Sequence, residues 1–145
     1  MSLSSDFNLR NSSVNIEDIA DAIDQFDNWL DYTPTVTGVM TISSLSISRA
    51  KWKQYGTELG IDISFTCTIS GTSSGTIIVS LPPFTGGIGV QPFTCSFSQP
   101  LSAGAKLALG QSDPFESRML VSKHDGAAWS NDTTRIGMNA RLRVS

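Results

Sequence analysis

The stretch ELGIDISFTCTIS, residues 58–70, alternates apolar and polar side chains with a period of two residues. Such alternation is typical of a β-strand with one face in a core and the other in water. The apolar face comprises Leu59, Ile61, Ile63, Phe65, Cys67 and Ile69. The stretch therefore predicts a half-buried strand, and the chain on either side of it should supply the partner strands.

The chain after residue 70 shows the same alternation of apolar and polar residues over shorter segments. The turn sequence SGTSSG leads into TIIVSLP, residues 76–82, and we expect this segment to form a hairpin with residues 58–70. Further strands are expected within PFTCSFS, AKLALGQ, ESRMLVSK and RIGMNARLRV, which are residues 92–98, 105–111, 116–123 and 135–144. No helix-length segment lies between these strands, so a parallel α/β fold is not expected.

About eight or nine strands separated by turns predict an all-β fold, an antiparallel β-sandwich of jelly-roll type. Only 16% of the residues are charged, which suits short strands joined by small polar turns. We assign the sandwich to residues 32–145. Its predicted core contains Ile61, Ile63, Phe65, Cys67, Phe93, Phe97, Met138 and Leu142.

Residues 16–31 follow a different period. Apolar side chains fall at intervals of three and four residues, which predicts an amphipathic helix capped by Asn15 and ended by Pro34. The apolar positions are Ile16, Ile19, Ile23, Phe26 and Leu30. A helix this short is marginal alone in water, so its stripe either packs on its own domain or mediates self-association. We favour a homotrimer, because isoleucine at both seam positions leans toward three or four strands.

The first 15 residues are polar, with Phe7 and Leu9 as isolated apolar points beside Arg10. Such a segment cannot bury enough apolar area to offset its own ordering entropy. We therefore expect an extended arm that becomes ordered on a partner, and we assign attachment to that partner to Phe7, Leu9 and Arg10. The chain then divides into an arm (1–15), an assembly helix (16–31) and a head (32–145).

Nucleic-acid binding and membrane insertion are not expected. Arg49, Lys51 and Lys53 form the only dense cationic cluster, whereas nucleic-acid binding usually takes a larger basic footprint. No stretch approaches the length of a membrane span, and the first residues lack the pattern of a signal peptide. In a protein assembled in the cytosol, Cys67 and Cys95 should stay free and buried, although the sequence leaves a disulfide open.

We also predict no catalytic site, metal or cofactor. His124 is the only histidine, it lies in the turn sequence SKHDGAAW, and no G-x-S-x-G elbow is present. One histidine and two separated cysteines fall short of a zinc site.

One loop is a candidate ligand site. Within HDGAAWSNDTT, residues 124–134, Asp125, Asn131 and Asp132 offer oxygen atoms and Trp129 offers a ring. Such a set suits stacking on a sugar or binding of Ca²⁺. The alternative, which we favour, is that Trp129 is tucked back and anchors the loop.

Two segments resemble the recurrent β-rich head module of tailed-phage virion proteins: WLDYTPTVTG (29–38) and RAKWKQYGTELGIDISFTCTISGTSSGTIIVSLP (49–82). In that module a W/Y-x-x-Y-x-P-T entry precedes an A-x-[WY]-x-x-x-G strand pair, a long alternating strand, a small-residue turn and a strand ending in L-P. The matching residues are Trp29, Tyr32, Pro34, Thr35, Ala50, Trp52, Gly56, Gly71, Gly75, Leu81 and Pro82. The resemblance implies a non-enzymatic virion surface protein, often trimeric.

Two functions follow from this resemblance. In the first, which we favour because a fibre would need additional shaft sequence, the chain is a capsid decoration or cement protein. Its arm and helix would then bind the major capsid protein or another virion protein. In the second, the chain is the receptor-binding tip of a tail or head fibre, and the head recognises a host surface glycan or protein.

Overall fold

The computed structural model describes residues 29–71 and 75–145, and within these ranges it contains nine β-strands and no helix. The strands are β1 (Leu30–Asp31), β2 (Val36–Gly38), β3 (Thr41–Tyr55), β4 (Glu58–Ser70), β5 (Ile77–Ser80), β6 (Pro92–Ser98), β7 (Lys106–Asp113), β8 (Arg118–Lys123) and β9 (Thr133–Arg143). The predicted arm residues Phe7, Leu9 and Arg10 lie outside the described residues. So do the seam residues Ile16, Ile19, Ile23 and Phe26 of the predicted helix.

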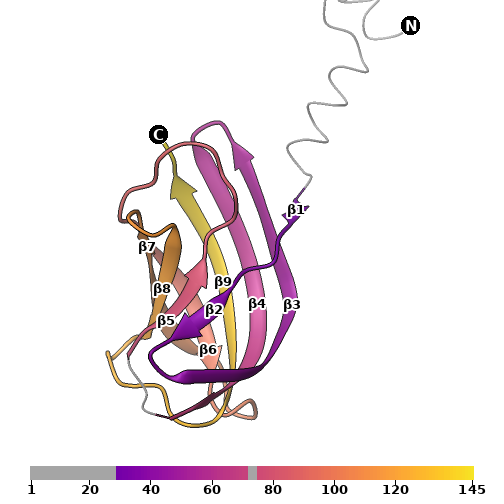
Figure 1. Cartoon of the computed structure of the whole chain (residues 1–145). Helices are drawn as coiled ribbons and strands as arrows, with labels where there is room; N and C mark the ends of the chain where they lie inside the picture. The colour runs from indigo at the N-terminus through magenta and orange to yellow at the C-terminus, as the bar shows by residue number, and fades with distance from the viewer. Residues whose placement is uncertain (1–28, 72–74) are drawn as a thin grey trace, which may run out of the picture.

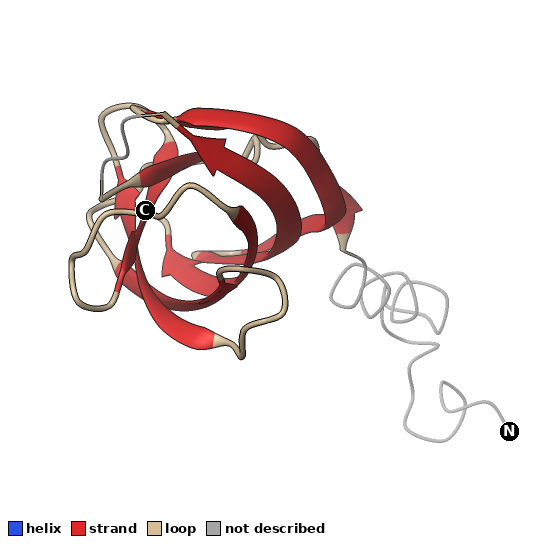
Figure 2. Cartoon of the chain, turned by 90° about the horizontal axis from the view of Figure 1, so that it is seen from below, coloured by secondary structure: helices blue, strands red, loops and turns tan. Residues whose placement is uncertain are grey.

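All nine strands belong to one antiparallel sheet, in the order β1-β3-β4-β9-β6-β7-β8-β5-β2. The prediction of an all-β antiparallel fold is confirmed. The sheet curls around the core as a half-barrel, as the views along and across the strands show (Figures 1 and 2), in place of the two stacked sheets that we expected. Two register shifts in β3, at Ser43/Ser46 and Ile47/Arg49, explain the difference, because β-bulges bend a strand and increase its twist.

The interior of the curled sheet is filled by the alternating residues that the sequence indicates. Every second side chain of β4, from Leu59 to Ile69, is buried, and β9 contributes a matching row from Ile136 to Leu142. The eight predicted core residues are all buried: Ile61, Ile63, Phe65, Cys67, Phe93, Phe97, Met138 and Leu142. This part of the prediction is confirmed.

The predicted hairpin between residues 58–70 and 76–82 is wrong. β4 pairs with β3 and β9, whereas β5 pairs with β8 and β2. Strand length explains the choice of partner: β3 and β9 have 15 and 11 residues, close to the 13 of β4, and β5 has only four. A tight turn at Gly56, with a positive φ of 60°, joins β3 directly to β4.

Residues 30–38 connect the two edges of this sheet. β1 pairs with β3, which would otherwise be one edge strand, and β2 pairs with β5 at the opposite edge. The hydrogen bonds continue between the strands. The Tyr32 amide donates to the Ala50 carbonyl (3.2 Å), and the Ser80 amide donates to the Thr35 carbonyl (3.0 Å). The ring of strands is therefore closed through residues 32–35.

The side chain of Tyr32 also stabilises this closure. Its hydroxyl donates to the Ser80 carbonyl oxygen at 3.1 Å, and the Thr35 amide donates to Ser80 Oγ at 2.8 Å. Burial raises the pKa of the Tyr32 hydroxyl far above its ordinary value, so the group remains a donor. Its ring also packs against the core.

Leu30 and Asp31 form a strand, so the prediction that the helix extends to residue 31 is wrong for its last two residues. Leu30 pairs with Trp52 on β3 and its side chain is 49% exposed. Just before it, Trp29 lies over Gly60, where a Cβ would stand 3.1 Å from the indole ring, and Lys53 Nζ lies 4.6 Å from the ring centroid. Pairing with the edge of β3 satisfies backbone groups that a helix end would leave without partners.

Three glutamine side chains hold connecting segments in place by the same contact. In each case Nε2 donates to the carbonyl of one residue and Oε1 accepts from the amide of that same residue. Gln54 contacts Thr85 in this way (2.7 and 2.8 Å), Gln91 contacts Arg143 (2.6 and 2.7 Å) and Gln99 contacts Ser130 (2.7 and 3.0 Å). We call these contacts glutamine brackets. They replace the hydrogen bonds that a neighbouring strand would make.

We expect the ring closure to be visible in the free energy of unfolding. Tyr32→Phe removes one hydrogen bond and should lower that free energy by about 1 kcal/mol. Tyr32→Ala also removes a partly buried ring and should lower it by about 2–3 kcal/mol. Urea unfolding followed by tryptophan fluorescence measures both changes. A Tyr32→Ala variant as stable as the unmodified chain would show that the closure adds nothing.

The glutamine brackets predict a sharp difference between two chemically identical substitutions. Gln99→Glu places a carboxylate oxygen against the Ser130 carbonyl and should destabilise the fold by about 1–3 kcal/mol. Gln111→Glu is the matched control, because Gln111 is exposed on β7 and its side chain has no hydrogen bond within residues 29–71 and 75–145. Its effect should stay within about 0.5 kcal/mol. Equal melting temperatures for the two variants would refute the role of the bracket.

Candidate functional site

The structure places Trp129 of the predicted ligand loop in the core. Its side chain is 1% exposed and meets the Phe97 ring edge-on, with 5.1 Å between centroids and 79° between planes. Lys123 Nζ lies 5.5 Å from the Trp129 ring centroid. Trp129 therefore presents no ring face for a sugar, in agreement with the alternative in which it anchors the loop.

The oxygen atoms of this loop are used to fold it. Asp125 Oδ1 accepts from the Ala127 amide at 3.0 Å, and this hydrogen bond lowers the pKa of the Asp125 carboxyl. Asp132 Oδ1 accepts from the Thr133 amide at 2.7 Å, and the Asp132 carbonyl accepts from the Ile69 amide. No hydrogen bond joins the Asn131 side chain to other residues in the described ranges. The arrangement does not gather these oxygen atoms around a common point.

The groups that the sequence offers for nucleophilic or acid–base chemistry lie apart from one another. His124 is exposed in a turn, with Nδ1 3.1 Å from the Leu107 carbonyl oxygen. Cys67 and Cys95 are free and buried, as expected, and burial raises their thiol pKa values to about 11 and about 12. Both thiols are therefore protonated and shielded at neutral pH. In the described ranges no helix is long and apolar enough to cross a membrane.

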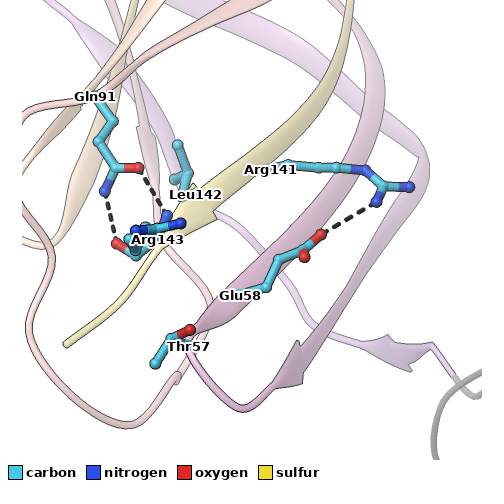
Figure 3. Close-up of a pocket in the computed structure, with 6 residues that line it drawn as sticks. All are labelled: Thr57, Glu58, Gln91, Arg141, Leu142 and Arg143. Carbon is cyan, nitrogen blue, oxygen red and sulfur yellow. Dashed lines mark hydrogen bonds and ion pairs between the residues drawn. The ribbon is translucent and has the colours of Figure 1, made fainter.

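Several shallow depressions of the described surface lie along β9. One is a shallow depression of about 510 Å³ lined by Thr57, Glu58, Gln91, Arg141, Leu142 and Arg143 (Figure 3). Its lining residues come from the β3–β4 turn, β4, β9 and the loop before β6, which the sheet order brings together. A neighbouring depression shares Thr57, Gln91 and Arg143 and continues to Ser145.

Charged groups at this first depression are held in defined positions. Glu58 Oε1 lies 3.1 Å from Arg141 Nη1 across the β4–β9 pair, as the dashed line in Figure 3 shows. The bracket from Gln91 fixes the backbone of Arg143. The Arg143 guanidinium itself forms no ion pair or hydrogen bond with the residues that the structure describes. It is therefore free to bind an anionic group.

A second depression, of about 480 Å³, lies in the middle of the same face. Its floor is Gly137 of β9, which pairs with Ser64 of β4 and Ser96 of β6. Asp62, Thr94, Leu107 and Asn139 form parts of its rim. A Cβ at Gly137 would meet Ser96 Oγ at 3.4 Å, an ordinary contact distance. Packing therefore does not require a glycine at position 137. The missing side chain leaves a hollow on the outer surface of the sheet, and the core is not affected.

We call the outward residues of β4, β9 and β6 around these depressions the polar face. It offers hydroxyl, amide, carboxylate and guanidinium groups, and a ligand would be bound by hydrogen bonds and ion pairs. The sequence analysis did not predict this face, because in the sequence its residues look like the ordinary solvent-facing side of each strand. Gly137 within an alternating strand was the available signal, since such a glycine often marks a site of close approach.

No protein-family model matches the chain, and no curated protein matches it in sequence. Among solved structures, it is similar to the head domain of phage bIL170, which was described with the receptor-binding domains of lactococcal phages. The two share 14% identity and a TM-score of 0.53, over 81% of this chain and 98% of that domain. A second match is the carboxy-terminal domain of the turkey type 3 siadenovirus fibre, avirulent form, in complex with 3-sialyllactose. It shows 12% identity and a TM-score of 0.38, over 74% of this chain and 100% of that one. The likeness to the phage head domain is a likeness of fold.

Proposed function

We propose that this chain is a non-enzymatic surface protein of a tailed-phage virion, and that its head binds a receptor on the host cell. The observation that carries the proposal is the fold likeness to the bIL170 head domain, which is matched over 98% of its length. The phage-like W-x-x-Y-x-P-T entry supports it, because Tyr32 and Thr35 of this entry make the contacts that close the ring of strands and Trp29 packs over Gly60. Of the two functions considered from sequence, receptor binding fits these observations better than capsid decoration.

The polar face is the part of the head that we assign to the receptor. Host-surface receptors for phages expose hydroxyl and charged groups, and binding them takes hydrogen-bonding side chains on a rigid support. The described strands supply both, because Ser64, Ser96 and Asn139 project from paired strands in the centre of the sheet. Arg143 adds an unpaired positive charge. A glycan with anionic substituents is the receptor chemistry that this set fits best.

Competition for phage adsorption tests the proposal. The purified chain should reduce adsorption of its phage to host cells. Gly137→Val adds a side chain at the floor of the second depression, with its Cβ 3.4 Å from Ser96 Oγ, so the concentration needed for half inhibition should rise at least about tenfold, equivalent to about 1.4 kcal/mol. Arg143→Ala should raise it as well. Ser46→Val is the matched control, because it adds a β-branched side chain to an exposed outward position of β3 away from both depressions.

The outcomes separate the parts of this proposal. If the unmodified chain does not compete, the receptor role is wrong. If it competes and Gly137→Val competes equally well, the receptor binds elsewhere on the head. Antibody labelling of virions adds a second test: a few copies at the tail tip agree with receptor binding, and many symmetric copies over the capsid would restore the decoration function.

A further inference from the structure

A depression outside the polar face lies at the edge of β3. Its volume is about 460 Å³, and residues 31–33 form one wall while residues 47–51 of β3 form the other. The two walls separate because the chain leaves β3 once the Tyr32 amide has bonded to the Ala50 carbonyl, and Thr35 then bonds to the edge of β5. We call this depression the seam, because it lies where the ring of strands is bridged by the connecting segment.

The seam combines apolar and polar side chains. The half-buried side chains of Tyr32 and Ile47 pack against the core and supply its apolar part. Thr33 and Ser48 are exposed and supply hydroxyl groups. A sugar ring needs both kinds of contact, because its C–H groups pack on apolar side chains while its hydroxyl groups require hydrogen bonds. The seam therefore has the composition of a carbohydrate subsite.

Two contacts across the β3–β4 pair join the seam to the second depression of the polar face. Arg49 Nε forms an ion pair with Asp62 Oδ2, and Asp62 belongs to the rim of the second depression. Ser48 Oγ donates to the carbonyl of Ser64, which lines that same depression, at 3.0 Å. Polar groups thus continue from one hollow to the other across β3 and β4.

The cationic side chains of the seam are available to an anionic ligand. Lys51 Nζ lies 2.8 Å from Asp31 Oδ1, and the Asp31 side chain is 82% exposed. An exposed ion pair of this kind contributes little stability, because water screens both charges. A ligand can therefore displace the Asp31 carboxylate from Lys51. The Arg49 side chain is 49% exposed and contacts Asp62 through Nε, so its guanidinium can donate to a ligand at the same time.

We infer that the seam is a second subsite for the receptor glycan and binds an anionic substituent on a further sugar unit. The inference rests on the receptor function proposed above and adds to it the length and course of the ligand. From Gly137 on β9 the path crosses β4 to reach β3, which is about 10 Å at a strand spacing of about 4.8 Å. A single sugar ring is too short for this distance. The ligand is therefore an anionic oligosaccharide that runs across the strands.

Glycan fragments of graded length test this inference. Oligosaccharides are released from the host cell surface by partial hydrolysis, separated by size and titrated against the full chain in a calorimeter. Fragments long enough to cover both hollows should bind at least about tenfold more tightly than the shortest fragments that bind, because the second contact is then intramolecular. Lys51→Glu should remove this gain and leave the affinity for the short fragments unchanged.

Two further variants control for charge. Lys106→Glu makes the same change in net charge at an exposed position of β7 that lines none of these depressions. It should change the affinity for long fragments by less than about twofold, because salt screens a distant exposed charge. Asp31→Asn should act in the opposite direction and raise that affinity about two- to threefold, because the ligand no longer competes with a carboxylate for Lys51.

The outcomes separate the subsite from the receptor function. The inference is wrong if affinity does not rise with fragment length, or if Lys51→Glu and Lys106→Glu act alike. An equal loss for fragments of every length in Lys51→Glu would also overturn it, because the substitution would then act on the first contact or on the fold. In each of these cases, binding by the unmodified chain leaves the receptor function standing. An unmodified chain that binds no fragment of any length would contradict the glycan receptor and the subsite together.

Discussion

The hydrogen bonding of residues 30–38 to both edges of the sheet is the constraint on which the barrel depends. Exposed sheet edges invite pairing with other chains, and here a single short segment covers two of them, β3 and β5. Pro34 lies between the Tyr32 amide, which bonds to Ala50, and the Thr35 amide, which bonds to Ser80 Oγ. Proline has no amide donor, so it fits a place in this segment where neither edge requires one. The core and the outer faces then follow from the curvature of the sheet, whose two ends residues 32–35 connect.

Alternation in the sequence was sufficient to predict which residues face the core, and insufficient to predict which strands pair. A period of two residues fixes the buried face of β4 from Leu59 to Ile69, whatever its neighbours are. The choice of β9 over β5 as a partner depends on strand length and on the path of the chain that connects β4 to β9. That connection covers residues 71–132, which is far beyond the range of a local pattern. The same limit explains the wrong prediction for Leu30. Its spacing fits the helical pattern, but its backbone pairs with the edge of β3, and a local pattern does not reveal that partner.

The candidate surfaces were harder to foresee for a related reason. In the sequence, Trp129 is a lone aromatic ring among polar residues. In the structure it is buried in the core, where it packs against Phe97. The polar face is assembled from strands that are distant in sequence, and each of its residues looks ordinary in its own strand. Charged side chains on β3, β4 and β9, and their absence from the outward positions at the centre of β5, β7 and β8 in the described chain, form two distinct surfaces only in three dimensions.

The glutamine brackets have a consequence for how the head can diversify. At Thr85, Arg143 and Ser130 each bracket contacts the backbone amide and carbonyl and not the side chain, so it does not specify the side chain at that position. Loops held in this manner can change sequence while their path over the barrel is kept. Such a scaffold lets the loops vary in sequence while the fold is kept, and it offers sites for loop grafting.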